Sequence, residues 1–257
     1  MMSNPQIISM LALTRKETTR VLRIWIQTII PPAITMTLYF IIFGTLIGRR
    51  IGQMDGFQYM EYIAPGLIMM SVITNSYGNV VGSFFHARMQ RHIEELLVAP
   101  MQEISIVMGY LAGGVIRGLF VAIVVSVVAL FFTQLRVEHP ILTLFIIIMT
   151  AGVFSLAGLL NAIFAKKYDD IAIIPSFVLA PLTYLGGVFY TISLLPTFWQ
   201  KLSYFNPILY MVNAMRFSVL GESDINIYFG VAVIVLFFIV LLCVAIYLLR
   251  KGVGIRE

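Results

Sequence analysis

The residues that could do chemistry in this chain are polar groups set among long apolar stretches. Arg117 is the one charged residue in a long apolar run, and it lies near the middle of that run. Asn75, Asn79 and Asn161 lie in two other apolar runs. An ionised side chain at mid-membrane costs at least about 2.5 kcal/mol, so Arg117 should face other helices and find a partner. We expect it to bond backbone carbonyls or one of the three asparagines. Contact with a substrate is the alternative.

Several charged residues cluster in residues 86–103, between two apolar runs. Met89, Ile93 and Leu96 recur at helical spacing, which predicts a short amphipathic helix that ends before Pro100. Docking on a partner protein and resting on the membrane surface both fit this pattern. The candidate docking residues are Arg88, Arg91, Ile93, Glu94, Glu95, Leu96 and Pro100.

A third region, residues 191–227, is too long and apolar for a simple loop and too broken for a clean span. Aromatic residues near its start suggest a short amphipathic helix at the membrane interface. Asn206 is a good N-cap and Pro207 suits the first helical position, so a second helix should run to Leu220 and Gly221. The pair predicts a re-entrant or outer helical hairpin that borders a pathway. An interfacial plug that fixes the tilt of the spans is the alternative.

The elements that must hold these groups follow from the composition. The 257 residues are 60% hydrophobic and 11% charged, with a mean hydropathy of +0.96, whereas a soluble domain carries about 25% charge. A spanning helix needs about 20 apolar residues. Six apolar runs are long enough: 24–48, 62–85, 105–132, 141–165, 171–190 and 228–249. Prolines and a Gly-Gly pair interrupt the fifth run, which predicts a kinked helix packed inside a bundle. The predicted fold class is an all-α membrane protein with six transmembrane helices.

The positive charges predict the orientation. Most of the 17 Lys and Arg residues flank the runs on the side that holds both termini, so both termini should be cytoplasmic. Residues 1–23 carry Arg15, Lys16, Arg20 and Arg23, which is typical of an interfacial helix facing anionic head groups. A flexible basic leader is the alternative. Residues 24–249 form the membrane domain and 250–257 a cytoplasmic tail, all within a single domain, 1–257.

Several motifs are missing from the sequence. There is no GxxxxGK[ST] phosphate-binding loop, no HExxH and no GxSxG, and no His/Cys cluster has metal-ligand spacing. We therefore expect no catalytic residue, no metal and no cofactor bound by this chain. No basic stripe with interleaved aromatics indicates nucleic-acid binding. Any energy for its activity must come from elsewhere.

Five stretches carry a resemblance to a known family. They are residues 23–28 with Pro31 and Pro32, 65–75, 93–100, 182–190, and Asn206-Pro207 with Tyr210 and Arg216. Over essentially its whole length the sequence resembles the ABC-2 type permeases, the membrane subunits of bacterial ABC exporters. The Glu-x-Leu-x-x-x-Pro-like loop and the Asn-Pro-x-x-Tyr segment are moderately specific for the broad family.

The resemblance implies six spans, a homodimer, and two copies of a separate ABC-type ATPase subunit that uses ATP and Mg²⁺, so this chain is not itself an enzyme. The helix around 88–99 would be the coupling helix that docks on the ATPase. The hairpin with Asn206, Pro207, Tyr210 and Arg216 would cap a path along the dimer interface. That path would be lined mainly by the first, second and fifth spans, with Tyr39, Phe40, Tyr184 and Phe189 as candidate lining residues.

These observations predict a permease subunit of a bacterial inner-membrane exporter for an amphipathic or hydrophobic substrate of the drug, lipid or glycan class. An ATP-independent secondary carrier or channel is the alternative, but the spans offer no acidic residue for a proton relay. A lipid-modifying membrane enzyme would need a nucleophile, metal or acid–base pair, and the sequence shows none.

Overall fold

The computed structural model describes residues 5–92 and 101–253, which fold into a bundle of long helices. The long helices are α1 (Pro5–Arg23), α2 (Trp25–Tyr39), α4 (Tyr59–Met89), α6 (Glu103–Leu130), α7 (Pro140–Phe164) and α12 (Ile227–Arg250). The shorter helical segments are η1 (Phe40–Ile47), α3 (Gly48–Ile51), α8 (Tyr168–Ile174), η2 (Pro175–Leu179), α9 (Ala180–Leu185), η3 (Ile192–Leu194), α10 (Thr197–Tyr204) and α11 (Pro207–Leu220). Two short strands, β1 (Gln53–Met54) and β2 (Phe57–Gln58), complete the fold.

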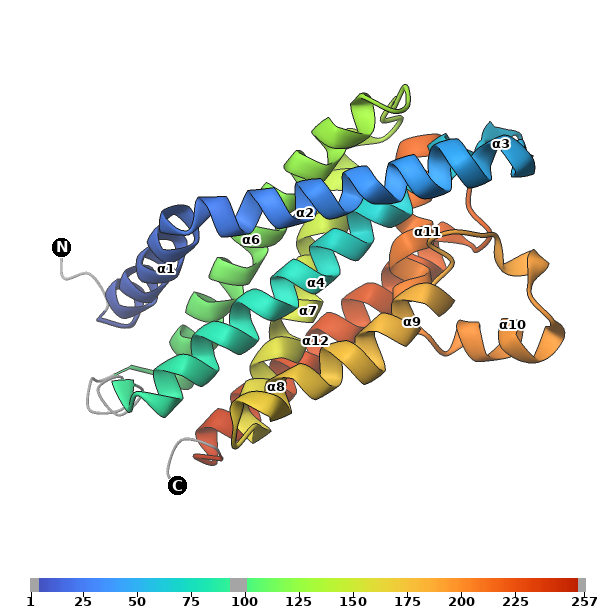
Figure 1. Cartoon of the computed structure of the whole chain (residues 1–257). Coiled ribbons are helices and arrows are strands. Elements are labelled where there is room, and N and C mark those ends of the chain that lie inside the picture. The colour runs from blue at the N-terminus through green and yellow to red at the C-terminus, as the bar shows by residue number, and fades with distance from the viewer. Residues whose placement is uncertain (1–4, 93–100, 254–257) are drawn as a thin grey trace.

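Helix α4 forms the centre of the bundle. Helices α6 and α7 pack along it, and α11 contacts it near the end where α3 lies (Figure 1). Most of its residues are buried, including the polar Ser71, Ser76 and Asn79. Protein surrounds α4 on most sides, so this helix can carry more polar residues than one that faces lipid.

The predicted first span continues without a break through α2, η1 and α3, from Trp25 to Ile51. A tight hairpin follows, in which β1 and β2 pair antiparallel. Its two turn residues, Asp55 and Gly56, have φ of 50° and 85°, as the favoured two-residue hairpin turn requires. The all-α prediction holds for the bundle but missed this hairpin, for which the Asp-Gly pair was the sequence signal.

The predicted fifth span is an interrupted helix. Helix α8 passes into the π-helical segment η2 at Pro175, and α9 then ends at Leu185, five residues before the predicted end. Proline cannot donate the backbone hydrogen bond of a regular helix, which accounts for the wider turn that begins there. Gly187 has a φ of 75° and turns the chain away from the helix axis. The predicted interruption is confirmed, but the predicted packing inside the bundle is wrong, because only Leu179 and Thr183 of this helix are buried.

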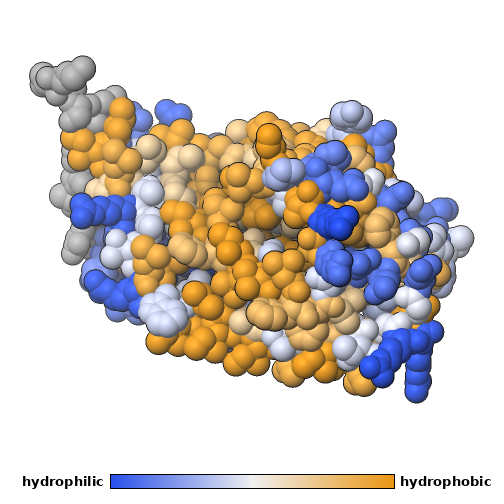
Figure 2. All heavy atoms as spheres, turned by 90° about the horizontal axis from the view of Figure 1, so that it is seen from above, coloured by the Kyte–Doolittle hydropathy of each residue, from blue (hydrophilic) through white to orange (hydrophobic). Residues whose placement is uncertain are grey.

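Four helical segments are long and apolar enough to cross a membrane within the described ranges: Trp25–Ile51, Glu103–Leu130, Pro140–Phe164 and Ile227–Arg250. They match the predicted first, third, fourth and sixth spans. Figure 2 shows apolar side chains across the middle of one face and hydrophilic ones gathered toward both ends. This banding is typical of a helical protein embedded in a bilayer.

The helix ends divide between two sides of the molecule. Helix α1, the last turns of α4 and the end of α12 lie at one end of the bundle, whereas α3 and α10 lie at the other (Figure 1). The chain therefore begins and finishes its described course on the same side.

Candidate functional site

The predicted docking segment is only partly covered by the described residues. Arg88 and Arg91 are described, and Ile93, Glu94, Glu95, Leu96 and Pro100 lie outside that part of the chain. Arg88 belongs to the last turn of α4, because α4 ends at Met89 and Arg91 has a positive φ of 61°. The expected helix from 88 to 99 is therefore wrong at its start.

Arg88 joins α4 to the end of α7. Its Nη1 donates hydrogen bonds to the carbonyl oxygens of Ala162, Ile163 and Ala165, at 3.2, 2.8 and 2.9 Å. The last carbonyls of a helix have no partner within the helix, and a cation there also complements the helix dipole. The segment that follows α4 thus starts from a point that is fixed to two of the long helices.

The outer hairpin forms largely as predicted. Helix α10 exposes Phe198 and Trp199, and α11 begins at Pro207 and ends at Leu220, before the left-handed Gly221. The Asn206 Oδ1 accepts the N–H of Ile208 at 3.0 Å, so the N-cap prediction is confirmed. The Asn206 amide nitrogen also donates to the Leu182 carbonyl at 2.6 Å. Asn206 therefore fixes the hairpin to the end of α9.

Tyr210 fixes the hairpin from within. Its hydroxyl donates to the Tyr204 carbonyl at the end of α10, at 2.7 Å. Its ring meets Phe229 of α12 edge to face, with centroids 5.6 Å apart. The Asn-Pro-x-x-Tyr segment thus sets the angle between α10, α11 and the last long helix.

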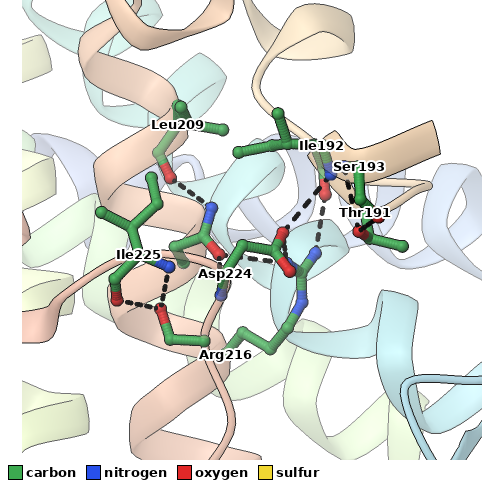
Figure 3. A network of polar contacts seen from close by, with 10 residues as sticks. Thr191, Ile192, Ser193, Leu209, Arg216, Asp224 and Ile225 are labelled. Carbon is green, nitrogen blue, oxygen red and sulfur yellow. Dashed lines mark hydrogen bonds and ion pairs between the residues drawn. The ribbon is translucent and has the colours of Figure 1, made fainter. Parts of the chain in front are cut away.

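Arg216 lies at the centre of a buried network and is 1% exposed. Figure 3 shows its guanidinium between Asp224 and the loop that carries Ile192. Its Nη2 donates to the Gly187 carbonyl at 2.6 Å, and its Nη1 lies 3.5 Å from the Asp224 carboxylate. Its Cζ stands 3.9 Å from the centroid of the Tyr62 ring on α4. Arg216 therefore links α11, α4 and the connections on both sides of the hairpin.

Asp224, which the sequence analysis did not single out, is the carboxylate of this network. It accepts the N–H of Ile192 at 3.5 Å, and its own N–H donates to Asn213 at 3.1 Å. Burial raises the pKa of the Asp224 carboxyl above its ordinary value, although the Arg216 charge acts in the opposite direction. No spacing rule could pair it with Arg216, because the partners meet only after α11 ends and the chain turns.

The intramembrane asparagines are not a shared hub for Arg117. Arg117 contacts only Asn75 among them, with 3.5 Å between Nη2 and Oδ1. Asn79 accepts a bond from Arg20 at 2.8 Å, and Asn161 donates to the Tyr77 hydroxyl at 2.7 Å. Of the three asparagines expected as alternative partners, Asn75 therefore meets Arg117, whereas Asn79 and Asn161 bond groups on other helices.

A polar cluster joins α1 to α4. Glu17 is 1% exposed, pairs with Arg20 at 2.9 Å, and accepts the Ser83 hydroxyl at 2.8 Å. Arg20 was expected to face head groups, but its guanidinium points inward to Glu17 and Asn79. The sequence reasoning missed Glu17, although a signal existed: Leu13, Glu17 and Val21 are four residues apart, so they share the buried face of one helix.

Three of the four candidate path-lining residues lie together at the end of the bundle near α3. Phe189 stands 5.8 Å from Tyr39, 4.6 Å from Phe43 and 6.1 Å from Tyr184, measured between ring centroids. Tyr184 is 46% exposed. Phe40 points elsewhere, because it is fully buried and stacks on Phe132 at 5.4 Å. We call Tyr39, Phe43, Tyr184 and Phe189 the aromatic cluster.

Within the described ranges, no group of three or more His, Cys, Asp or Glu residues could hold a metal ion. The polar side chains described above hold helices together, and none of them forms a nucleophile–base pair. A bundle of apolar helices with anchored polar groups and a partly exposed aromatic cluster is typical of a helical membrane protein.

Comparison with known proteins gives the family. The ABC-2 type transporter family matches residues 9–220, so the chain belongs to that family. It is 53% identical to the inner membrane transport permease YadH of Escherichia coli K12, over 97% of this chain and 98% of that one, and the same values hold for YadH of Shigella flexneri. It is 24% identical to nodulation protein J of Rhizobium leguminosarum bv. viciae, over 83% of each chain. The chain is a multi-pass inner-membrane permease of an ABC transporter.

Proposed function

We propose that this chain is the membrane subunit of an ATP-driven exporter. Six spans place both termini in the cytoplasm, and the permease works as a homodimer with two copies of an ABC-type ATPase that bind ATP and Mg²⁺. The chain itself binds no cofactor. The observation that carries this proposal is the family match over residues 9–220, together with helix ends that return to one side of the bundle.

The coupling role belongs to residues 93–100, with Glu94 and Glu95 as the principal contacts to the ATPase. This segment begins just beyond Arg88, whose bonds reach the last carbonyls of α7. A displacement of the segment by the ATPase would act on α4 and α7 together, because Arg88 joins both. The structure of α4 and α7 supports this route, since the two helices pack along much of their length.

The pathway runs beside α4, between the first and fifth spans. The aromatic cluster lies at its outer end and offers ring faces to an apolar or amphipathic molecule, while α10 and α11 cap that end. Cargo of the drug, lipid or glycan class fits such a surface. Tyr39, Tyr184 and Phe189 are the proposed lining residues, and the burial of Phe40 argues against its inclusion.

The test is mild detergent extraction of the tagged permease from its host, with identification and stoichiometry of the proteins that co-purify. We expect one P-loop ATPase per permease, and we expect the Glu94→Lys/Glu95→Lys variant to lose it while remaining folded and membrane-inserted. Glu222→Lys is the matched control, because Glu222 is exposed in the connection between α11 and α12. Retention of the ATPase and of transport in the double variant would refute the coupling assignment.

The second candidate, an ATP-independent carrier or channel, gives a different result in the same experiment. The permease would then purify intact and alone, and its activity in pure vesicles would follow an ion gradient.

A further inference from the structure

A hollow of about 280 Å³ opens between α1, α4 and α6. Its lining brings Lys16 and Arg20 of α1 to the same space as Arg117 of α6, with Asn79 and Ser83 of α4 between them. These residues are spread over a hundred positions of sequence. The hollow lies apart from the aromatic cluster and from the network around Arg216.

The hollow exists because α4 has glycine at two positions one turn apart. Gly78 and Gly82 both line it, and a Cβ added at either position would meet no atom within 4 Å. Residues four apart lie on the same face of a helix, so two side chains there would project into the same space. The close-packed glycines of this bundle, such as Gly66, have no comparable room.

The hollow is lined by more donors than acceptors: the Glu17 carboxylate lines it too, but it already accepts from Arg20 and Ser83. Arg20 is already paired with Glu17, whereas within residues 5–92 and 101–253 no carboxylate pairs with Lys16 or Arg117. The Nε of Arg117 and the Nδ2 of Asn79 are buried and have no hydrogen-bond partner among the described atoms. Unpartnered buried donors are costly. The missing partner is therefore an acceptor, and the positive charge favours an anion.

A second groove lies on the surface of α1 and shares two lining residues with the hollow. It holds about 600 Å³ and is lined by Arg15, Lys16, Thr19, Arg20 and Arg23, of which Lys16 and Arg20 also line the hollow. Cationic side chains thus continue from the exposed face of α1 to Arg117 at the middle of α6.

We propose that this hollow binds a phosphate head group carried by an amphiphile. The guanidinium of Arg117 donates to the phosphate oxygens, with Lys16 and Arg20 at the entrance. Arginine suits phosphate because its planar donors can bind two oxygens at once. The ligand is either a membrane phospholipid or the transported substrate. Only the second source rests on the proposed function, since binding itself requires no ATPase.

The test uses the purified full-length permease without ATPase, in an uncharged detergent, with dihexanoyl phosphatidic acid as the probe. Dihexanoylglycerol serves as its uncharged match and inorganic phosphate as the free anion. We expect the phosphatidic acid to bind and the glycerol form to bind at least about tenfold more weakly. Equal binding of the two probes would overturn the proposal.

Two variants locate the site. Arg117→Gln should weaken phosphatidic acid binding about tenfold or more. Gly82→Leu should block binding by filling the hollow while every charge remains, so it decides the question even if Arg117→Gln fails to fold. Lys201→Gln is the control, because Lys201 is exposed on α10 at the other end of the bundle (Figure 1), and binding by this variant should stay within about twofold. Wild-type binding by folded Gly82→Leu protein would place the ligand elsewhere.

The source of the phosphate follows from two further measurements. Competition by inorganic phosphate at similar concentration indicates a site for the anion alone, whereas preference for phosphatidic acid indicates a head group with its acyl chains. If phosphatidic acid inhibits transport by the complete complex, it competes with the cargo for the site. If it binds without changing transport, the site holds a membrane lipid. A site for the anion alone would overturn the proposal that an amphiphile carries the phosphate. None of these results depends on whether the ATPase co-purifies.

Discussion

The two arginines within the bundle are held in opposite ways. Arg216 meets a carbonyl, a carboxylate, an amide and an aromatic ring, all supplied by this chain. Among the described residues, Arg117 makes one hydrogen bond, at 3.5 Å to Asn75, and it lines an open hollow. Both charges must be balanced away from water. Residues of this chain balance the first charge, and the proposed phosphate ligand would balance the second.

The difference follows from the surroundings. Near Arg216, α11 is short and the connections on either side fold back over it, so backbone carbonyls and Asp224 come within reach. Near Arg117, α4 presents Gly78 and Gly82, and the space beside them stays open. One arginine therefore fixes helices, and the other is free to take part in recognition.

The largest contrast is expected from removing each charge. Arg216→Met should lower the free energy of unfolding by about 3 kcal/mol, because it leaves Asp224 without its cationic partner and breaks the bond to Gly187. Arg117→Met should change it by less than about 1 kcal/mol, since little within the chain depends on that charge. Thermal unfolding of both variants in detergent measures the difference. Equal losses would contradict the distinction between the two sites.

A smaller contrast is expected when the same glycine substitution is made in each region. Gly66→Ala should cost about 1–3 kcal/mol, because its Cβ would stand 2.8 Å from the Val188 carbonyl oxygen, and backbone yields little. Gly78→Ala should be neutral or stabilise α4 by up to about 1 kcal/mol, since open space surrounds it. The unfolding midpoints of the two variants test this difference. An unchanged midpoint for Gly66→Ala would mean that the packing around Gly66 can yield more than its contacts indicate.

The smallest effect separates the two tasks of Asn206. Asn206→Ala should cost about 1–2 kcal/mol, because it removes the cap of α11 and the bond to Leu182. Asn206→Asp keeps the capping oxygen and loses only the donor, so it should cost less than the alanine variant. Identical losses, read from the same unfolding curves, would show that the bond to α9 carries the whole effect.

Much of the local structure could be predicted from residue types. Asn206-Pro207 and Gly221 gave the limits of α11, and the interruption at Pro175 followed from proline chemistry. The separation of Phe40 from Tyr39 could not be predicted, because successive residues of a helix face different neighbours and only packing reveals which. The bond from Arg88 to α7 joins segments that are far apart in sequence, and no periodicity reports it.

The sequence by itself determined the membrane environment, the helical fold class and the family. These follow from the length of apolar runs, the low content of charged residues and the spacing of motifs, which are all properties of the sequence alone. Only the tertiary structure decided which polar groups meet. It turned Arg20 inward to Glu17, paired Arg216 with Asp224 and left Arg117 beside an open hollow. The physical reason is that burying a charge is tolerable only with a suitable partner, and partners from different helices are chosen by packing.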